Sequence, residues 1–251
     1  MKIKKECRDG IGWIVLNQPE RRNAIDTEMM GRLKEILTEY ENDGDIKLVV
    51  ITGSGSKAFC SGGDLSVFHN LHTEDEAYAM LSKMGDILFQ LFTFPKPTIA
   101  LLNGTAVGGG CEIASACDFR IGFPHVKLGF IQGTLGITTG WGGSTYLMER
   151  LDPVAAFEML LTATTYSADE ALTLNFIQKI LNSNDQLKEF NEYVSPMLQL
   201  SLDVLQAYKQ RSLDRMDLIH MKTRIDREIK ECARLWESDD HHIAVRKFLD
   251  H

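Results

Sequence analysis

In the first half of the chain, segments with the apolar pattern of a β-strand alternate with segments with the apolar pattern of an α-helix. Residues 11–16 form a short β-prone run, and residues 48–51 form a continuous apolar run typical of a strand covered on both faces. A helix is predicted after Asp26 and another over 73–92, and a further strand over 98–103 follows. The first of these helices carries apolar residues on one face, at Met29, Met30, Leu33, Ile36, Leu37 and Tyr40. The alternation predicts an α/β fold with parallel strands.

Two pairs of residues have the spacing of a helix capping box. Thr73 precedes Glu76 by three residues at the start of the second predicted helix, and Ser167 precedes Glu170 in the same way. We therefore expect helices to begin at both places.

The last part of the chain carries only helical patterns. They run from about residue 187 onward, and Ser195-Pro196 is predicted to interrupt them. We therefore expect a core over 1–195 and a separate helical region over 196–251. The stretch 214–237 mixes charges with an apolar stripe at Met216, Ile219, Ile225, Ile229 and Leu235. Such a stripe suits packing against the core or against another subunit.

Composition narrows the class of protein. The 251 residues include 27 Lys and Arg against 35 Asp and Glu, a net charge of −8, which argues against nucleic-acid binding as the main function. No run of about 18 apolar residues is present, and the basic start at 1–6 precedes no apolar stretch, so we expect neither a membrane span nor a signal peptide. We also expect reduced thiols, no metal site and a cytoplasmic location, because the cysteines lack metal-ligand or disulfide spacing: Cys7, Cys60, Cys111, Cys117 and Cys232.

Three glycine-rich loops, at 57–65, 103–114 and 136–143, are candidates for ligand contact. None matches the pattern of a P-loop or of a dinucleotide-binding loop. Gly108–Gly110 in the second loop let a backbone or a ligand come close, and they lead into a helix whose first turn offers free N–H groups. That arrangement can hold an oxyanion. The alternative is a tight turn needed only for helix–sheet packing.

Glu112 is the one acidic residue at the start of that helix. It is either a carboxylate that complements the helix dipole or a partly desolvated general acid or base with a raised pKa. Its neighbour Cys111 is either a small buried apolar residue or a nucleophile for covalent acyl transfer. We interpret the other candidates as structural: Trp141 and the Met29-Met30 pair as core, and His69, His72, His241 and His242 as solvated surface residues.

Several blocks of the sequence resemble the crotonase superfamily, also called the enoyl-CoA hydratase/isomerase family. They are the segments 15–25, 57–65 and 95–100 and, most specifically, 103–118, and they occur in the order and at the spacing of the family. The resemblance covers nearly the whole chain. It implies a spiral of ββα units with a C-terminal helical region that builds homotrimers, often paired into hexamers.

The resemblance also implies an acyl-coenzyme A thioester as substrate, with no separate cofactor because coenzyme A is part of that substrate. The backbone N–H groups of Ser61 and Gly109 occupy the positions of the oxyanion hole. Two fixed donors there would stabilise the negative charge of a thioester enolate. The positions that hold the adenine and pantetheine correspond to Asn23, Ala24, Gly63, Asp64 and Leu65.

The catalytic positions show a departure from the family's hydratases, which use two glutamates. Glu112 matches the first, whereas Gln132 aligns with the second, and an amide cannot act as a base. The sequence is more similar to a branch that decarboxylates short malonyl-type thioesters, and Trp141-Gly142-Gly143 also resembles the alkylmalonyl-CoA decarboxylases. We therefore expect decarboxylation of a short alkylmalonyl-CoA. The alternatives are a short-chain enoyl-CoA hydratase or isomerase and, more remotely, a non-catalytic scaffold or RNA-binding homologue.

Two further expectations concern the ends of the acyl-CoA site. Val67, Phe68 and Leu71 are candidates for lining the acyl pocket. Family members often end in a basic tail that contacts the phosphates of coenzyme A. This chain ends instead at Phe248-Leu249-Asp250-His251, so Arg246 and Lys247 are the candidates to replace that tail.

Overall fold

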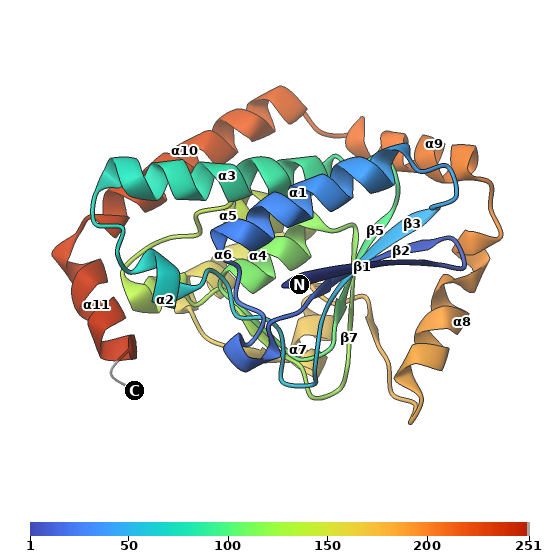
Figure 1. The fold of residues 1–251 in the computed structure, drawn as a ribbon, viewed down its shortest axis with the longest axis horizontal. Helices are drawn as coiled ribbons and strands as arrows, with labels where there is room; N and C mark the ends of the chain where they lie inside the picture. The colour runs from blue at the N-terminus through green and yellow to red at the C-terminus, as the bar shows by residue number, and fades with distance from the viewer. Residues whose placement is uncertain (250–251) are drawn as a thin grey trace.

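The computed structural model describes residues 1–249, which form two sheets surrounded by helices (Figure 1). The larger sheet has the strand order β1-β2-β3-β5-β7-β10, with bounds Ile3–Arg8, Ile11–Leu16, Leu48–Gly53, Thr98–Leu102, Phe119–Gly122 and Lys179–Ile180. The smaller sheet has the order β4-β6-β8-β9, with bounds Ala58–Cys60, Thr105–Val107, Lys127–Gly129 and Tyr166–Ser167.

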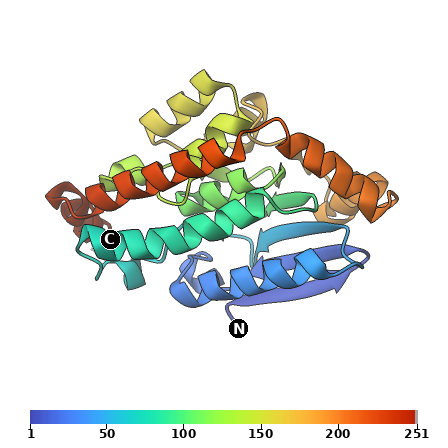
Figure 2. The ribbon, with the colours of Figure 1, turned by 90° about the horizontal axis from the view of Figure 1, so that it is seen from above.

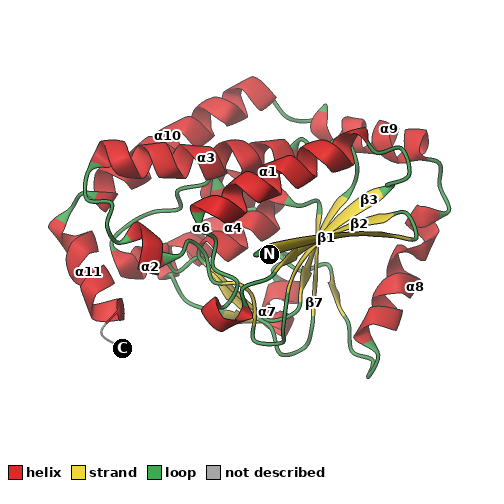
Figure 3. Ribbon diagram, viewed as in Figure 1, coloured by secondary structure: helices red, strands yellow, loops and turns green. Residues whose placement is uncertain are grey.

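Helices make up much of the rest of the described chain (Figure 3). The α-helices are α1 Thr27–Asn42, α2 Leu65–Phe68, α3 Glu74–Phe92, α4 Gly109–Ala116, α5 Gly143–Arg150, α6 Pro153–Thr162, α7 Ala168–Thr173, α8 Gln186–Leu198, α9 Leu202–Leu213, α10 Leu218–Trp236 and α11 Asp239–Leu249. Two 3-10 helices complete the set, η1 Pro19–Arg21 and η2 Gln132–Leu135. Within residues 1–249 no helix combines the length and the apolar character needed to cross a membrane.

The α/β fold with parallel strands is confirmed. In the larger sheet, β2, β3, β5, β7 and β10 pair in parallel, and β1 alone is antiparallel to its neighbour β2. Strand β1 is absent from the sequence-based prediction. Its hairpin is signalled by Asp9-Gly10, which both adopt positive φ, 53° and 79°, as a tight two-residue connection requires.

The predicted helix starts are confirmed. The Asp26 side chain accepts a hydrogen bond from the N–H of Met29 at the start of α1. Both capping boxes form, Thr73 with Glu76 at α3 and Ser167 with Glu170 at α7. In each case a side chain satisfies N–H groups that the first turn of a helix leaves free.

The predicted break at Ser195-Pro196 is wrong, because α8 runs through Pro196 to Leu198. Pro196 lies in the last turn, so it removes the one hydrogen bond that its N–H would have made, and only Met197 and Leu198 of the helix follow it. Phe190 and Val194 of the same helix are fully buried in a core cluster against Trp13. This burial holds the helix together across the proline. The division into 1–195 and 196–251 stays a prediction.

The main apolar core lies between the sheets and the layer formed by α1, α3 and α10 (Figure 2). Helix α10 comes close to α3 at Gly85, where a methyl group would lie 2.5 Å from a side-chain carbon of Ile229. Ile225 and Ile229 of the predicted apolar stripe are buried there, but Ile219 is 85% exposed. The buried face of α10 instead runs through Met221, Ile225, Ile229, Cys232, Ala233 and Trp236.

Candidate active site

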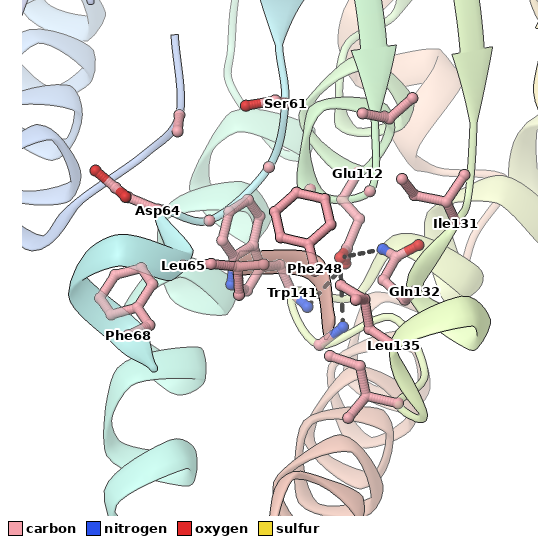
Figure 4. Close-up of a pocket in the computed structure, with 18 of the residues that line it drawn as sticks. Ser61, Asp64, Leu65, Phe68, Glu112, Ile131, Gln132, Leu135, Trp141 and Phe248 are labelled. Carbon is pink, nitrogen blue, oxygen red and sulfur yellow. Dashed lines mark hydrogen bonds between the residues drawn. The ribbon is translucent and has the colours of Figure 1, made fainter. Parts of the chain in front are cut away.

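A cavity of about 710 Å³ opens beside the start of α4 (Figure 4). Its walls come from segments far apart in the sequence: η1 and the loop before α2, the start of α4, η2, and helices α3, α10 and α11. Apolar side chains form much of its lining, among them Leu81, Ile131, Leu135, Ile137, Trp141, Trp236 and Phe248. The site therefore combines an apolar chamber with a few polar groups.

Glu112 is a buried carboxyl group of this cavity, and it is 2% exposed. Its Oε2 accepts hydrogen bonds of 2.8 Å from the N–H groups of both Trp141 and Gly143, and its Oε1 accepts a longer one from Gly140. Burial, together with the negative charge of Glu228, raises the pKa of Glu112 to about 7, although these N–H donors act in the opposite direction. Glu112 can therefore both hold and release a proton near neutral pH.

The Gly140-Trp141-Gly142-Gly143 loop can surround Glu112 because its glycines lack side chains. A methyl group on Gly143 would lie 2.3 Å from the Glu112 side chain, and one on Gly140 would collide with Cys232 and Leu81. Gly142 has a φ of 95°, a conformation that other residues rarely adopt. The sequence segment that resembles alkylmalonyl-CoA decarboxylases thus forms the cradle of the carboxyl group.

Gln132 lies at the start of η2 and contacts Glu112 directly (Figure 4). Its Nε2 donates a hydrogen bond of 2.9 Å to Oε1 of Glu112, and Gln132 is 8% exposed. Within residues 1–249 its Oε1 has no hydrogen-bond partner. Because Gln132 also lines the cavity, this oxygen can accept a hydrogen bond from a water or a bound molecule.

Ser61, predicted as an oxyanion donor, has its N–H engaged within the protein. Its N–H already donates a hydrogen bond of 3.1 Å to the carbonyl oxygen of Arg22. The N–H groups of Gly63 and Gly109 have no acceptor in the part of the chain that the structure describes, and both residues line the cavity. A methyl group on the intervening Gly62 would lie 3.0 Å from the Gly109 nitrogen, so the two loops are close together. Gly63 and Gly109 are therefore the better pair of donors.

Four of the five predicted coenzyme A contacts line the cavity: Ala24, Gly63, Asp64 and Leu65. Asp64 caps α2 and accepts a hydrogen bond of 2.8 Å from Arg21. Asn23 does not line the cavity. It is fully buried, and its amide nitrogen donates to the carbonyl oxygens of Ser54 and Ala58. Asn23 therefore joins loops of the fold, and its role as a ligand contact stays a prediction.

Cys111 is unsuited to covalent catalysis. It is fully buried, it does not line the cavity, and its Sγ donates to the carbonyl oxygen of Ala106 at 3.0 Å. Burial raises the pKa of the thiol well above its usual range, so the nucleophilic thiolate does not form. Its interpretation as a small buried residue is correct.

Two interpretations of aromatic residues need correction. Trp141 does belong to the core, but it also lines the cavity, with its ring against Gly109 and Gly63. His241 is 2% exposed rather than solvated, and its Nδ1 lies 2.7 Å from the carbonyl oxygen of Leu135. Its ring packs against Trp236, so it supports the wall of the cavity from behind.

The expectations for the acyl pocket and the C-terminus hold only in part. Of the three candidates near α2, Phe68 lines the cavity, whereas Val67 is 41% exposed and Leu71 packs against the core. Phe248 of α11 reaches the cavity, while Arg246 and Lys247 are exposed and do not line it. Residues 250–251 lie outside the described part of the chain.

Sequence reasoning missed several residues of the site. Leu135, Trp236 and Phe248 come from segments for which no motif exists, and only the folded chain brings them together. Glu228 was also missed. It lies on α10 within the stretch of mixed charges, and nothing in the pattern distinguishes it from its exposed neighbours.

Comparisons with known proteins agree with this architecture. Residues 6–251 match the model of the enoyl-CoA hydratase/isomerase family. The chain is 33% identical over 194 residues to crotonyl-CoA hydratase from Syntrophomonas wolfei, covering 77% of this chain and 74% of that one. It is 30% identical over 242 residues to human ethylmalonyl-CoA decarboxylase, covering 95% of this chain and 78% of that one.

A solved structure supports the fold. The crystal structure of enoyl-CoA hydratase from Bacillus halodurans matches with a TM-score of 0.90 at 24% identity, covering 98% of this chain and all of that one. The chain therefore belongs to the enoyl-CoA hydratase/isomerase family, within the crotonase superfamily of acyl-CoA enzymes.

Proposed function

We propose that this protein decarboxylates a short alkylmalonyl-CoA. The observation that carries the proposal is the pairing of one buried carboxyl group, Glu112, with an amide, Gln132, at 2.9 Å. Loss of CO₂ generates a thioester enolate directly, so the reaction needs a proton donor but no base. A carboxyl group with a pKa of about 7 suits the role of donor at neutral pH.

The reaction divides into two steps. The bond between the α-carbon and the carboxylate breaks, CO₂ leaves, and the electron pair passes to the thioester oxygen as an enolate. The N–H groups of Gly63 and Gly109 stabilise that oxygen as its charge develops. Protonated Glu112 then gives its proton to the α-carbon, which yields the saturated acyl-CoA, and Glu112 regains a proton from solvent.

The apolar chamber favours a short alkyl substituent on the substrate. Leu81, Leu135 and Trp236 offer it dispersion contacts, and the indole N–H of Trp236 already donates a hydrogen bond to the carbonyl oxygen of Leu71. Several relatives at 30% identity or more carry the name ethylmalonyl-CoA decarboxylase, which supports a substituent of this size.

Hydration of a short-chain enoyl-CoA is the second candidate. It is favoured by the free Oε1 of Gln132, which can orient a water beside Glu112. Relatives named crotonyl-CoA hydratase and short-chain-enoyl-CoA hydratase support the same reading. Glu112 would then have to serve as both base and acid, which lowers the expected rate.

Assembly into a homotrimer or hexamer is part of the proposal. It is supported by an apolar face of α6 on which Val154, Phe157 and Leu161 are 75%, 54% and 68% exposed. A contiguous face of this kind is typical of a subunit contact. A cytoplasmic location is likewise proposed, from the cysteine pattern.

A turnover screen of the purified protein on ethylmalonyl-, methylmalonyl- and crotonyl-CoA tests the proposal. We expect CO₂ release from at least one malonyl-type thioester and little hydration of crotonyl-CoA. Brisk hydration without CO₂ release would favour the second candidate.

A further inference from the structure

Glu228 holds the start of helix α5 from the neighbouring helix α10. It is half-buried, and its Oε1 accepts hydrogen bonds from Thr139 Oγ1 at 2.6 Å and from the N–H of Ser144 at 3.1 Å. Its Oε2 accepts from the N–H and the hydroxyl of Thr145, at 3.0 and 2.8 Å. These four bonds hold the loop that precedes α5 at Thr139 and hold the first turn of α5 at Ser144 and Thr145.

The same loop surrounds Glu112. The N–H groups of Gly140, Trp141 and Gly143 point to Glu112, while those of Ser144 and Thr145 point to Glu228. Five of the six N–H groups of residues 140–145 are therefore divided between two carboxylates. A movement of this backbone segment changes the hydrogen bonds of both carboxylates.

We propose that Glu228 is a positioning residue for Glu112, which holds the loop around that carboxyl group and places a second negative charge beside it. Glu228 does not line the cavity, so it acts through the loop and through its charge rather than by contact with a bound molecule. The inference concerns the free enzyme and does not depend on which thioester is the substrate.

The two effects of Glu228 on Glu112 have opposite signs. By fixing the loop, Glu228 keeps in place the N–H donors that favour ionised Glu112, whereas its charge raises the pKa of Glu112. The other titratable groups close to Glu112 are Tyr146 on α5, Cys232 on α10 and the neighbouring Cys111. Burial raises the pKa of all three well above neutral, so they stay uncharged. Glu228 is therefore the charged side chain that adjusts the proton affinity of Glu112.

Glu228→Gln removes the charge and keeps the size of the side chain, and its amide oxygen can still accept the two hydrogen bonds of one carboxylate oxygen. The matched control is Glu231→Gln, one turn further along α10, where the side chain is 54% exposed and pairs with Arg234. We would titrate the carboxyl carbon of Glu112 by ¹³C NMR in free protein labelled at glutamate, with Glu112→Gln to assign the signal. Circular dichroism and thermal unfolding would check that each variant folds.

We expect the Glu112 titration to move to lower pH in Glu228→Gln and to stay unchanged in Glu231→Gln. A Glu228→Gln protein that folds and titrates like the wild type would overturn the inference. Glu228→Asp keeps the charge on a shorter side chain, and we expect it to return the midpoint toward the wild-type value. A Glu112 midpoint in Glu228→Asp that equals the midpoint in Glu228→Gln would also contradict the inference. A role confined to holding the fold would change the unfolding temperature and leave the midpoint in place.

Discussion

The amide nitrogen of Gln132 donates a hydrogen bond of 2.9 Å to Oε1 of Glu112, so the second polar group beside the buried carboxyl is one that cannot exchange a proton at neutral pH. This pair separates the site from one that works with two carboxyl groups. It leaves Glu112 as the acid–base group of the pair.

Gln132→Glu should change the two candidate reactions in opposite directions. A second carboxyl group supplies an acid–base partner, so hydration of crotonyl-CoA should rise by about 10²-fold. It also places a like charge near the substrate carboxylate in a poorly solvated site, so CO₂ release from ethylmalonyl-CoA should fall. Both rates would be measured on wild type and variant. A parallel rise or a parallel fall would contradict this account of Gln132.

Gly63 offers a cleaner test of the oxyanion donors than Gly109. A methyl group on Gly109 would lie 2.1 Å from Trp141, so any substitution there disturbs packing. On Gly63 the nearest contact is Phe68 at 3.3 Å. Gly63→Pro removes the N–H and should lower kcat by about 10²–10³-fold, whereas Gly63→Ala keeps the N–H and should retain most of the activity. Equal losses in the two folded variants would assign the effect to packing instead.

The pH dependence of decarboxylation should follow the protonation of Glu112. Because burial and Glu228 raise its pKa to about 7, the protonated donor is present below that pH and is lost as the pH rises through it. We expect kcat to decline above about pH 7. Glu112→Gln should lower kcat by about 10²–10⁴-fold and abolish that decline. A profile that rises through pH 7 would indicate that ionised Glu112 is the active form.

Cys111→Ala should leave turnover close to that of the wild type. The thiol is fully buried, hydrogen-bonded to Ala106 and held in its protonated form, so it takes no part in the chemistry. Steady-state kinetics on the thioester turned over best would check this. A loss of turnover in a folded variant would reinstate a covalent acyl intermediate.

The sequence predicted what depends on local pattern. Capping residues such as Asp26 and Thr73 act within a few positions of themselves, so their roles follow from spacing alone. The Gly108–Gly110 loop and Glu112 were likewise found because one short segment contains both.

What the sequence could not predict depends on contacts between distant segments. Whether Ser61 or Gly63 has a free N–H is decided by the carbonyl oxygen of Arg22, some forty residues earlier. Glu228 approaches Glu112 only because α10 packs beside α5. Pro196 was misjudged because tertiary burial of α8 outweighed the local cost of a proline.

The most direct test of the proposed reaction is a single turnover of ethylmalonyl-CoA labelled with ¹³C in its free carboxyl group, run in D₂O with wild type and Glu112→Gln. The account predicts ¹³CO₂ release by the wild type together with one deuterium at the α-carbon of the acyl-CoA product, and strong loss of both in the variant. The account would be contradicted if the wild-type enzyme left the labelled substrate intact while the same preparation rapidly hydrated crotonyl-CoA.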